Sequence, residues 1–149
     1  MDLKDCFRKG LIKKTVPEDG LIRSLIAMAA SKEIAVRSAP ITAETISAFV
    51  SLAYDALREV LEALCVSRGH KVLSHICIGQ LLRDLLPNFD YDTFDRIRWI
   101  RNSINYYGKS VELEQGKEII EQIFALKRNM MQEHLSGYTD TAKNSDRAA

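Results

Sequence analysis

Apolar residues along this chain recur at intervals of three and four, the spacing that places side chains on one face of an α-helix. The clearest run lies between Thr42 and Gly69. Glycine and proline are scarce, with 7 and 3 copies, and they separate the helical stretches from one another. No stretch alternates strictly between apolar and polar residues, so the pattern predicts helices and no strand. The apolar positions of the clearest run are Ile46, Phe49, Val50, Ala53, Leu57, Val60, Leu61 and Leu64.

Start and stop signals divide the chain into six helical stretches. A short helix is expected within residues 3–14, ending in a basic turn, and a second helix over 17–37, with Pro17 in its first turn. Thr42 can cap the third helix, which Gly69 ends, and Ser74 can cap a fourth, which Pro87 stops. The fifth runs from residue 90 or 92 to 108, and the last covers about 111–135.

These stretches predict an all-α fold, since helices joined by short turns pack as antiparallel neighbours. We expect an up-and-down bundle of four main helices plus a short N-terminal helix. The domain should span residues 1–135, and the polar, aperiodic residues 136–149 should form a disordered tail. A chain of 149 residues is long enough to bury a core without a metal or disulfide.

Composition narrows the function classes. The net charge of +1 gives no global attraction to nucleic acid, so any phosphate site must be local. The cysteines, Cys6, Cys65 and Cys77, are an odd number without close spacing, which favours buried thiols in a reducing compartment. No apolar run is long enough to span a bilayer, and the N-terminus lacks the apolar core of a signal peptide. We therefore expect a cytoplasmic protein without membrane contact.

The fifth helix carries the most unusual chemistry, in the segment from Arg101 to Gly108. A polar strip borders its apolar face, and the guanidinium and carboxamide groups of that strip can direct several donors at one phosphate oxygen. The alternative is that the arginines pair with Asp92, Asp95 or an acidic residue of a neighbouring helix. The strip contains Arg98, Asn102 and Asn105, with Arg101 at its edge, and the apolar face contains Phe94, Ile97, Ile100, Ile104 and Tyr107.

A family resemblance favours the phosphate site. Arg101-Asn102, followed by Tyr106-Tyr107 and a glycine, resembles the motif of the HEPN domain family, and the segments 54–59 and 74–75 also match it. The likeness is closest to short, single-domain archaeal members and covers about residues 11–135. It implies a helical bundle that forms homodimers, with two motifs facing each other. Many members are ribonucleases, and some are toxins encoded beside a minimal nucleotidyltransferase that acts as antitoxin.

The chain departs from that motif at one position. The family has a histidine four to six residues after the arginine, whereas this chain has Tyr106 five residues after Arg101. Histidine has an ordinary pKa of about 6.5 and tyrosine of about 10, so an unassisted phenol can donate a proton at neutral pH but rarely accepts one. The sequence therefore predicts weakened or absent cleavage.

The other candidate residues have structural interpretations. His75 lies on or beside the apolar stripe of the fourth helix, which indicates packing, and His70 is expected in an exposed turn. Histidines and cysteines show no metal-ligand spacing, and no phosphate-binding loop is present, so neither a metal nor a cofactor is expected. The group Arg58, Glu59 and Glu62 is typical of an ion-paired face, and the sequence leaves open whether Tyr54 and Asp55 contact the Arg101 strip.

Three hypotheses follow. In the first, the protein is a metal-independent endoribonuclease in which Arg101 and Asn102 hold the scissile phosphate, Arg98 and Asn105 assist, and Tyr106 replaces histidine. In the second, it is a non-catalytic module that binds RNA, a nucleotide or a partner such as a nucleotidyltransferase. In the third, the strip only joins two subunits. The RNA target is not specified by the sequence.

Overall fold

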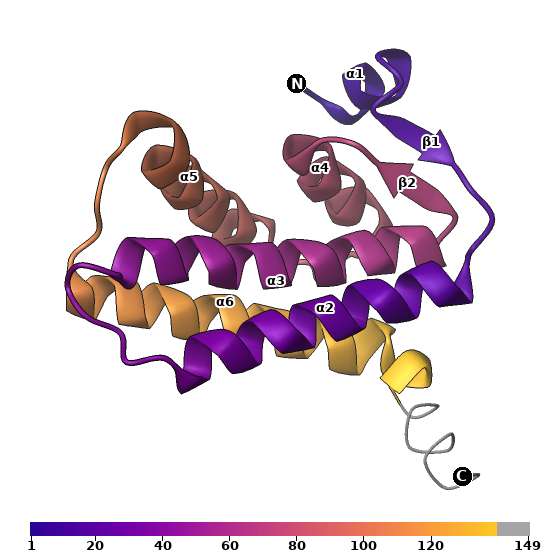
Figure 1. Cartoon of the computed structure of the whole chain (residues 1–149). Helices are drawn as coiled ribbons and strands as arrows, with labels where there is room; N and C mark the ends of the chain where they lie inside the picture. The colour runs from indigo at the N-terminus through magenta and orange to yellow at the C-terminus, as the bar shows by residue number, and fades with distance from the viewer. Residues whose placement is uncertain (140–149) are drawn as a thin grey trace, which may run out of the picture.

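The computed structural model describes residues 1–139, and these form an all-α bundle, as predicted (Figure 1). Every predicted helical stretch is present. Four helices are long, with 17 to 22 residues each, and a shorter α4 connects two of them. The elements are α1 (Leu3–Arg8), β1 (Ile12–Lys14), α2 (Asp19–Ser38), α3 (Ile46–Ser67), β2 (His70–Val72), α4 (His75–Leu85), α5 (Tyr91–Tyr107) and α6 (Leu113–His134).

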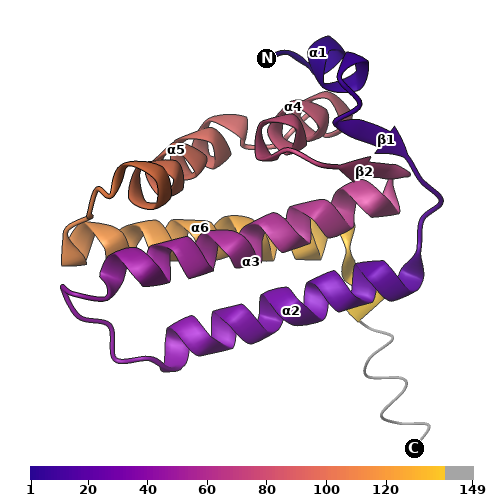
Figure 2. The same cartoon turned by 45° about the horizontal axis from the view of Figure 1, so that its top comes forward.

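Helix α3 is the centre of the bundle. Most of its residues are buried on all sides, including Tyr54, Leu57 and Leu61, because α2 and α6 cover one side of it and α4 and α5 the other (Figures 1 and 2). The long helices alternate in direction along the chain: α2 and α5 run opposite to α3 and α6. This is the expected up-and-down order, with α4 inserted between α3 and α5.

Local capping explains where α5 begins and ends. The carboxylate of Asp90 accepts a hydrogen bond from the Thr93 backbone N–H at 3.2 Å, which fixes the first turn. Gly108 ends the helix with φ of 62°, a left-handed conformation that costs glycine little. Both boundaries match the sequence prediction.

A small sheet was not predicted. Strands β1 and β2 pair antiparallel, with Ile12 opposite Val72 and Lys14 opposite His70, where a basic turn and an exposed turn were expected. His70 is therefore half-buried, and its ring packs edge-on against Phe7. Each strand has only three residues, which is too short for an alternating pattern to be recognised.

The prediction of three free thiols is wrong for two of the cysteines. Cys6 in α1 and Cys77 in α4 form a disulfide, while Cys65 is a free, buried thiol whose pKa is raised to about 12 by burial. The two bonded cysteines are 71 residues apart in the sequence, and only the docking of α1 on α4 brings them together.

The predicted tail begins inside the described part of the chain. Residues 136–139 are helical, and the Tyr138 carbonyl accepts a hydrogen bond from Arg23 at 2.9 Å. The Arg23 guanidinium also lies over the Tyr138 ring, 5.5 Å from its centroid. The rest of the predicted tail, residues 140–149, lies outside the described residues. Within residues 1–139, no helix combines the length and apolar character needed to cross a membrane.

Candidate functional site

The polar residues of α5 lie on two adjacent ridges of the helix. Arg98, Asn102 and Tyr106 are spaced by four residues and form the ridge that faces the start of α4. Arg101 and Asn105 form the neighbouring ridge, which faces α3. The five predicted site residues thus do not point at one place but divide between two neighbouring helices.

The first ridge lines a hollow of about 320 Å³ between α5 and the start of α4, which we term the α4–α5 hollow. The two helices lie next to each other above α3 in Figure 2. This hollow brings a histidine to the predicted strip, although sequence reasoning interpreted that histidine as a packing residue. Its lining is Leu73, Ser74, His75, Ile76, Arg98, Asn102 and Tyr106.

Arg98 is buried and ion-paired. Its Nε and Nη2 atoms both donate to one oxygen of Asp95, at 3.1 and 2.8 Å. Within residues 1–139, its Nη1 atom makes no hydrogen bond and is not enclosed. The ion-pair alternative is therefore confirmed for Arg98, yet one NH₂ group of the guanidinium stays available for a ligand.

Arg101 faces α3. Its Nη2 lies 3.7 Å from a carboxylate oxygen of Asp55. The Asn105 amide satisfies its neighbours when its oxygen faces Arg101, accepting from Nε at 3.0 Å and Nη2 at 3.3 Å, while its nitrogen donates to Ser51. The Arg101 guanidinium also lies 5.5 Å from the ring centroid of Tyr54. The question left open by the sequence is thus answered, because Tyr54 and Asp55 both contact the strip.

His75 is held by Tyr54. The Tyr54 hydroxyl lies 3.3 Å from Nδ1 of His75, and the Tyr54 side chain is fully buried. A phenol that donates to Nδ1 leaves the proton of the neutral imidazole on Nε2, whereas an Nδ1–H that donates to the phenol leaves Nε2 with a free lone pair. Since one hydroxyl supports both tautomers, Nε2 can act as either donor or acceptor.

The surroundings keep His75 uncharged. Burial lowers its pKa to about 4, and the charges of Arg58, Arg101 and Arg98 act in the same direction, against a smaller opposite effect of Asp55. Burial likewise raises the pKa of the Tyr54 phenol. At neutral pH both groups are therefore neutral partners in one hydrogen bond.

This depressed pKa predicts a pH-dependent stability. His75 takes up a proton near its ordinary pKa of about 6.5 in the unfolded chain, but only near about 4 in the folded chain. The folded state therefore has its full stability above pH 6.5 and loses stability as the pH falls from 6.5 toward 4. Because the ring is only half-buried, we expect a loss on the order of 1–2 kcal/mol. Urea denaturation of wild type and His75→Gln at pH 7, 5.5 and 4 measures it. If the free energy of unfolding fell equally with pH in both proteins, His75 would not be the group responsible.

The predicted apolar face of α5 is correct at its start and wrong at its end. Phe94 and Ile97 are fully buried, and Ile100 and Ile104 are partly buried, but Tyr107 is 69% exposed. Residues 105–110, which end α5 and begin the connection after it, are exposed, so the Tyr107 side chain is left in solvent. Tyr106 is 71% exposed and Trp99 55%. Tyr106 is thus an exposed ring in the lining of the hollow, and Trp99 is a second exposed ring on the same helix.

Among residues 1–139, no three histidine, cysteine, aspartate or glutamate side chains are close enough together to hold a metal ion. Neither His70 in β2 nor His134 at the end of α6 contacts a predicted site residue. The predicted ion-paired face is confirmed, as Arg58 pairs with Glu62 at 2.6 Å and Glu59 pairs with Lys32 of α2.

Comparison with known proteins identified no relative. No family model, no curated protein and no solved structure matched the chain.

Proposed function

We propose that this protein binds single-stranded RNA at the α4–α5 hollow and cleaves it without a metal ion, as the HEPN resemblance implies. The observation that carries the proposal is the position of His75 on the same hollow as Arg98, Asn102 and Tyr106. The histidine that the motif lacks in sequence is supplied by another helix.

Several features favour an anionic ligand. Arg58, Arg98 and Arg101 all lie close enough to act electrostatically on His75, and Asp55 is shared by two of them, at 4.0 Å from Arg58 and 3.7 Å from Arg101. The first backbone N–H groups of α4 can also donate to an anion, because the side chain of Ser74 at the N-cap position accepts no hydrogen bond from them. The free NH₂ group of Arg98 and the Asn102 amide complete a set of donors suited to phosphate oxygens.

The exposed aromatic rings of α5 favour single-stranded RNA over a duplex. Sequence-tolerant binding of unpaired nucleotides uses aromatic rings on which bases stack, beside cationic groups that contact the backbone. Trp99 and Tyr106 are exposed rings on the same side of α5 as Asn102. We therefore assign the bases to these exposed rings and the phosphate to the hollow.

The residues present can carry out transesterification. His75 Nε2 takes the proton of the RNA 2′-hydroxyl, whose oxygen attacks the adjacent phosphorus, and the P–O5′ bond breaks. The Tyr106 phenol donates a proton to the departing 5′-oxygen. The products are a 2′,3′-cyclic phosphate and a 5′-hydroxyl, and the proton on His75 returns to Tyr106 through solvent. In this scheme Tyr106 is asked only to donate a proton, which is the role that a phenol can take in general acid catalysis.

Arg101 has a positioning role in this proposal. Its ion pair with Asp55 connects α5 to α3, and its hydrogen bonds hold Asn105, which contacts Ser51 of α3. Its guanidinium lies 5.9 Å from the ring centroid of Tyr106. Asn105 is engaged by Arg101 and Ser51, so it also acts through its neighbours rather than on the phosphate.

Binding without cleavage is the second candidate function. It is favoured by the ion pairs of Arg98 with Asp95 and of Arg101 with Asp55, since a scissile phosphate must compete with these carboxylates for the guanidinium groups. Such a module would hold RNA or a nucleotide through the same hollow.

The test is incubation of the purified protein with a fluorescent single-stranded RNA in EDTA at low salt, with a 2′-deoxy analogue beside it. Cleavage of the RNA but not of the analogue supports the enzyme, and affinity for both without cleavage supports the module. Asn102→Ala should weaken binding by about tenfold. Arg96→Ala, on the side of α5 that contacts Gln122 of α6, is the matched control and should bind normally. Absence of affinity at low salt would overturn both functions.

A further inference from the structure

Positive charge is concentrated in the two segments that form and adjoin the β1–β2 sheet. Residues 6–17 and 63–83 contain seven of the 21 lysines and arginines of the chain and none of its 20 acidic residues. The net charge of +1 therefore hides a local excess of cations. The second segment also supplies residues 73–76 to the lining of the α4–α5 hollow. The seven cationic residues are Arg8, Lys9, Lys13, Lys14, Arg68, Lys71 and Arg83.

Two of these cations lie directly opposite each other on the sheet. Lys13 of β1 pairs with Lys71 of β2. Successive side chains of a strand point to opposite faces, so both lysines lie on the face away from Ile12 and Val72, which are buried. Both lysines are exposed, and within residues 1–139 neither side chain forms a hydrogen bond or an ion pair. The outward face of the sheet thus presents two unpaired ammonium groups.

This lysine pair is unfavourable for the sheet itself. Like charges directly opposite each other destabilise an antiparallel pair, and a sheet of two three-residue strands has little stability of its own. Neither segment contains a carboxylate that could reduce the repulsion. Such a local conflict is expected where side chains bind a ligand, and here the missing countercharge is that of an anion.

The lysine face continues into the α4–α5 hollow. The Leu73 N–H donates to the Leu11 carbonyl at 2.8 Å, so the pairing of the two segments extends one residue beyond β2. Leu73 therefore lies on the same face as Lys71, two residues further along and about 7 Å away. Its side chain is 53% exposed and lines the hollow. A single exposed apolar residue thus separates the lysine pair from the proposed phosphate site.

We infer that Lys13 and Lys71 form a second phosphate site, which binds the backbone of the same single-stranded RNA that occupies the hollow. This inference rests on the proposed function and extends it from one phosphate to a chain. Lysine suits such a site, because an ammonium on a flexible stem contacts a phosphate as a point charge and selects no base. RNA is favoured over an anionic membrane, because the lysine face leads into a hollow that a strand can enter and a flat bilayer cannot.

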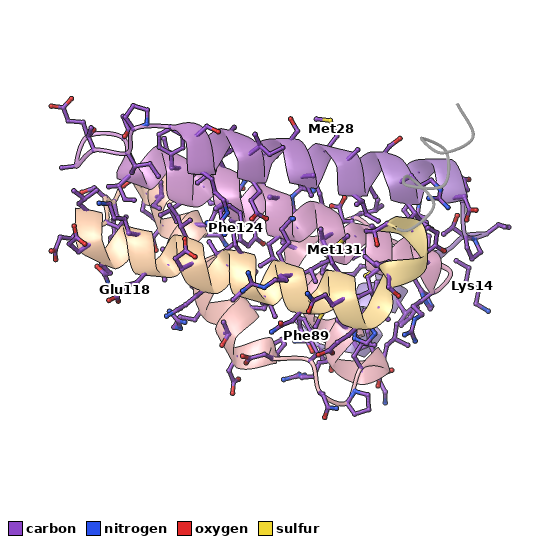
Figure 3. All side chains as sticks on the ribbon, turned by 90° about the horizontal axis from the view of Figure 1, so that it is seen from below. Lys14, Met28, Phe89, Glu118, Phe124 and Met131 are labelled. Atoms are coloured by element: carbon purple, nitrogen blue, oxygen red, sulfur yellow. A yellow bond between two sulfur atoms is a disulfide. The ribbon has the colours of Figure 1, made fainter. Side chains whose placement is uncertain are left out.

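The arrangement of the elements agrees with one continuous surface. The sheet, α4 and α5 all lie on the same side of α3 (Figures 1 and 2). Lys14 and Arg68 are exposed at the end of the sheet that is farther from Leu73. Figure 3 shows Lys14 at the opposite end of the molecule from Glu118 of α6. Positive charge therefore continues along the sheet away from the hollow, in the direction that a longer strand would follow.

Binding of an uncleavable 2′-O-methyl RNA of about twelve nucleotides tests the inference. The double variant Lys13→Gln/Lys71→Gln removes both charges and leaves polar side chains in their place. It should weaken binding about 25-fold at about 0.1 M salt, and the slope of log affinity against log salt concentration should fall by about 1.4, which is about 0.7 for each lost phosphate contact. A strand of about three nucleotides should bind wild type and variant alike, because it occupies only the hollow.

The matched control is Lys117→Gln/Arg128→Gln. It removes the same charge from α6, which lies on the other side of α3, so this variant should bind the long strand like wild type. Urea denaturation shows whether the variants are folded. The sheet variant should be at least as stable as wild type, because it has lost a like-charge pair.

The outcomes separate this inference from the proposed function. If Lys13→Gln/Lys71→Gln binds the long strand with wild-type affinity and salt slope while Asn102→Ala weakens binding, the second site is overturned and the proposed function stands. If only the lysine variant weakens binding, the lysine site stands and the proposed role of the hollow is overturned. Absence of binding to either strand overturns both. Tighter binding of wild type to vesicles of phosphatidylserine and phosphatidylcholine than to RNA, lost in the lysine variant, would overturn the assignment of these lysines to RNA.

Discussion

Replacing His75 with glutamine should lower metal-independent RNA cleavage by about 10²–10⁴-fold, the usual contribution of a positioned general acid or base. Glutamine keeps a polar group near the Tyr54 hydroxyl but cannot accept a proton from the 2′-hydroxyl. Because the imidazole is assigned to proton transfer and not to holding the phosphate, the loss should be in kcat, with RNA affinity nearly unchanged. Single-turnover cleavage in EDTA, with detection of the 2′,3′-cyclic phosphate, measures the effect.

The pH profile separates a catalytic His75 from a structural one. A base with a pKa of about 4 stays unprotonated down to about that pH. The value of kcat/KM should therefore be constant from neutral pH to about 5 and fall only below about pH 5. Tyr54→Phe removes the hydroxyl that holds Nδ1, and it should shift the acid limb while keeping the aromatic packing against Phe94. A His75→Gln protein that is folded, binds RNA and cleaves at the wild-type rate would refute the role of this histidine.

Reduction of the disulfide between Cys6 and Cys77 should lower the free energy of unfolding by about 4 kcal/mol, the loop-entropy value for a cross-link over this distance in sequence. The bond joins α1 to α4 and restrains a long segment of the unfolded chain. Cys65 adds nothing to this effect, because it is a free thiol in either state. Urea denaturation with and without dithiothreitol measures the change.

Substitution provides the control for that measurement. Cys6→Ala should unfold at the same urea concentration as the reduced wild type, apart from the small cost of the lost sulfur, and dithiothreitol should have no further effect on it. Identical unfolding curves for oxidised and reduced wild type would show that the two sulfurs do not stabilise the fold through a bond.

The helices of this fold were predictable because their signals are local. The start of α5 depends on Asp90 and its end on Gly108, each acting on backbone groups within one or two turns. The same holds for the apolar positions of α3, whose spacing identifies a buried helix without knowledge of its partners. The two short strands were not predictable, since three residues each carry almost no pattern and exist only as a pair.

The candidate site was predicted in part. The polar strip of α5 and its ion-pair alternative follow from helical spacing, and the structure brings Arg98, Asn102 and Tyr106 to one hollow. The separate direction of Arg101 and Asn105 depends on where α3 lies, which the spacing does not specify. His75 was interpreted as a packing residue because nothing near it in the sequence indicates that α5 lies beside it.

The sequence by itself therefore determined the all-α class, the positions of the helices and the polar strip, all of which arise from hydrogen bonds and periodicities within a few residues. Only the tertiary structure decided that His75 meets Tyr54 and lies on the same hollow as part of the strip, and that Cys6 meets Cys77. These pairings join residues far apart in the sequence, and packing of the helices around α3 selects them.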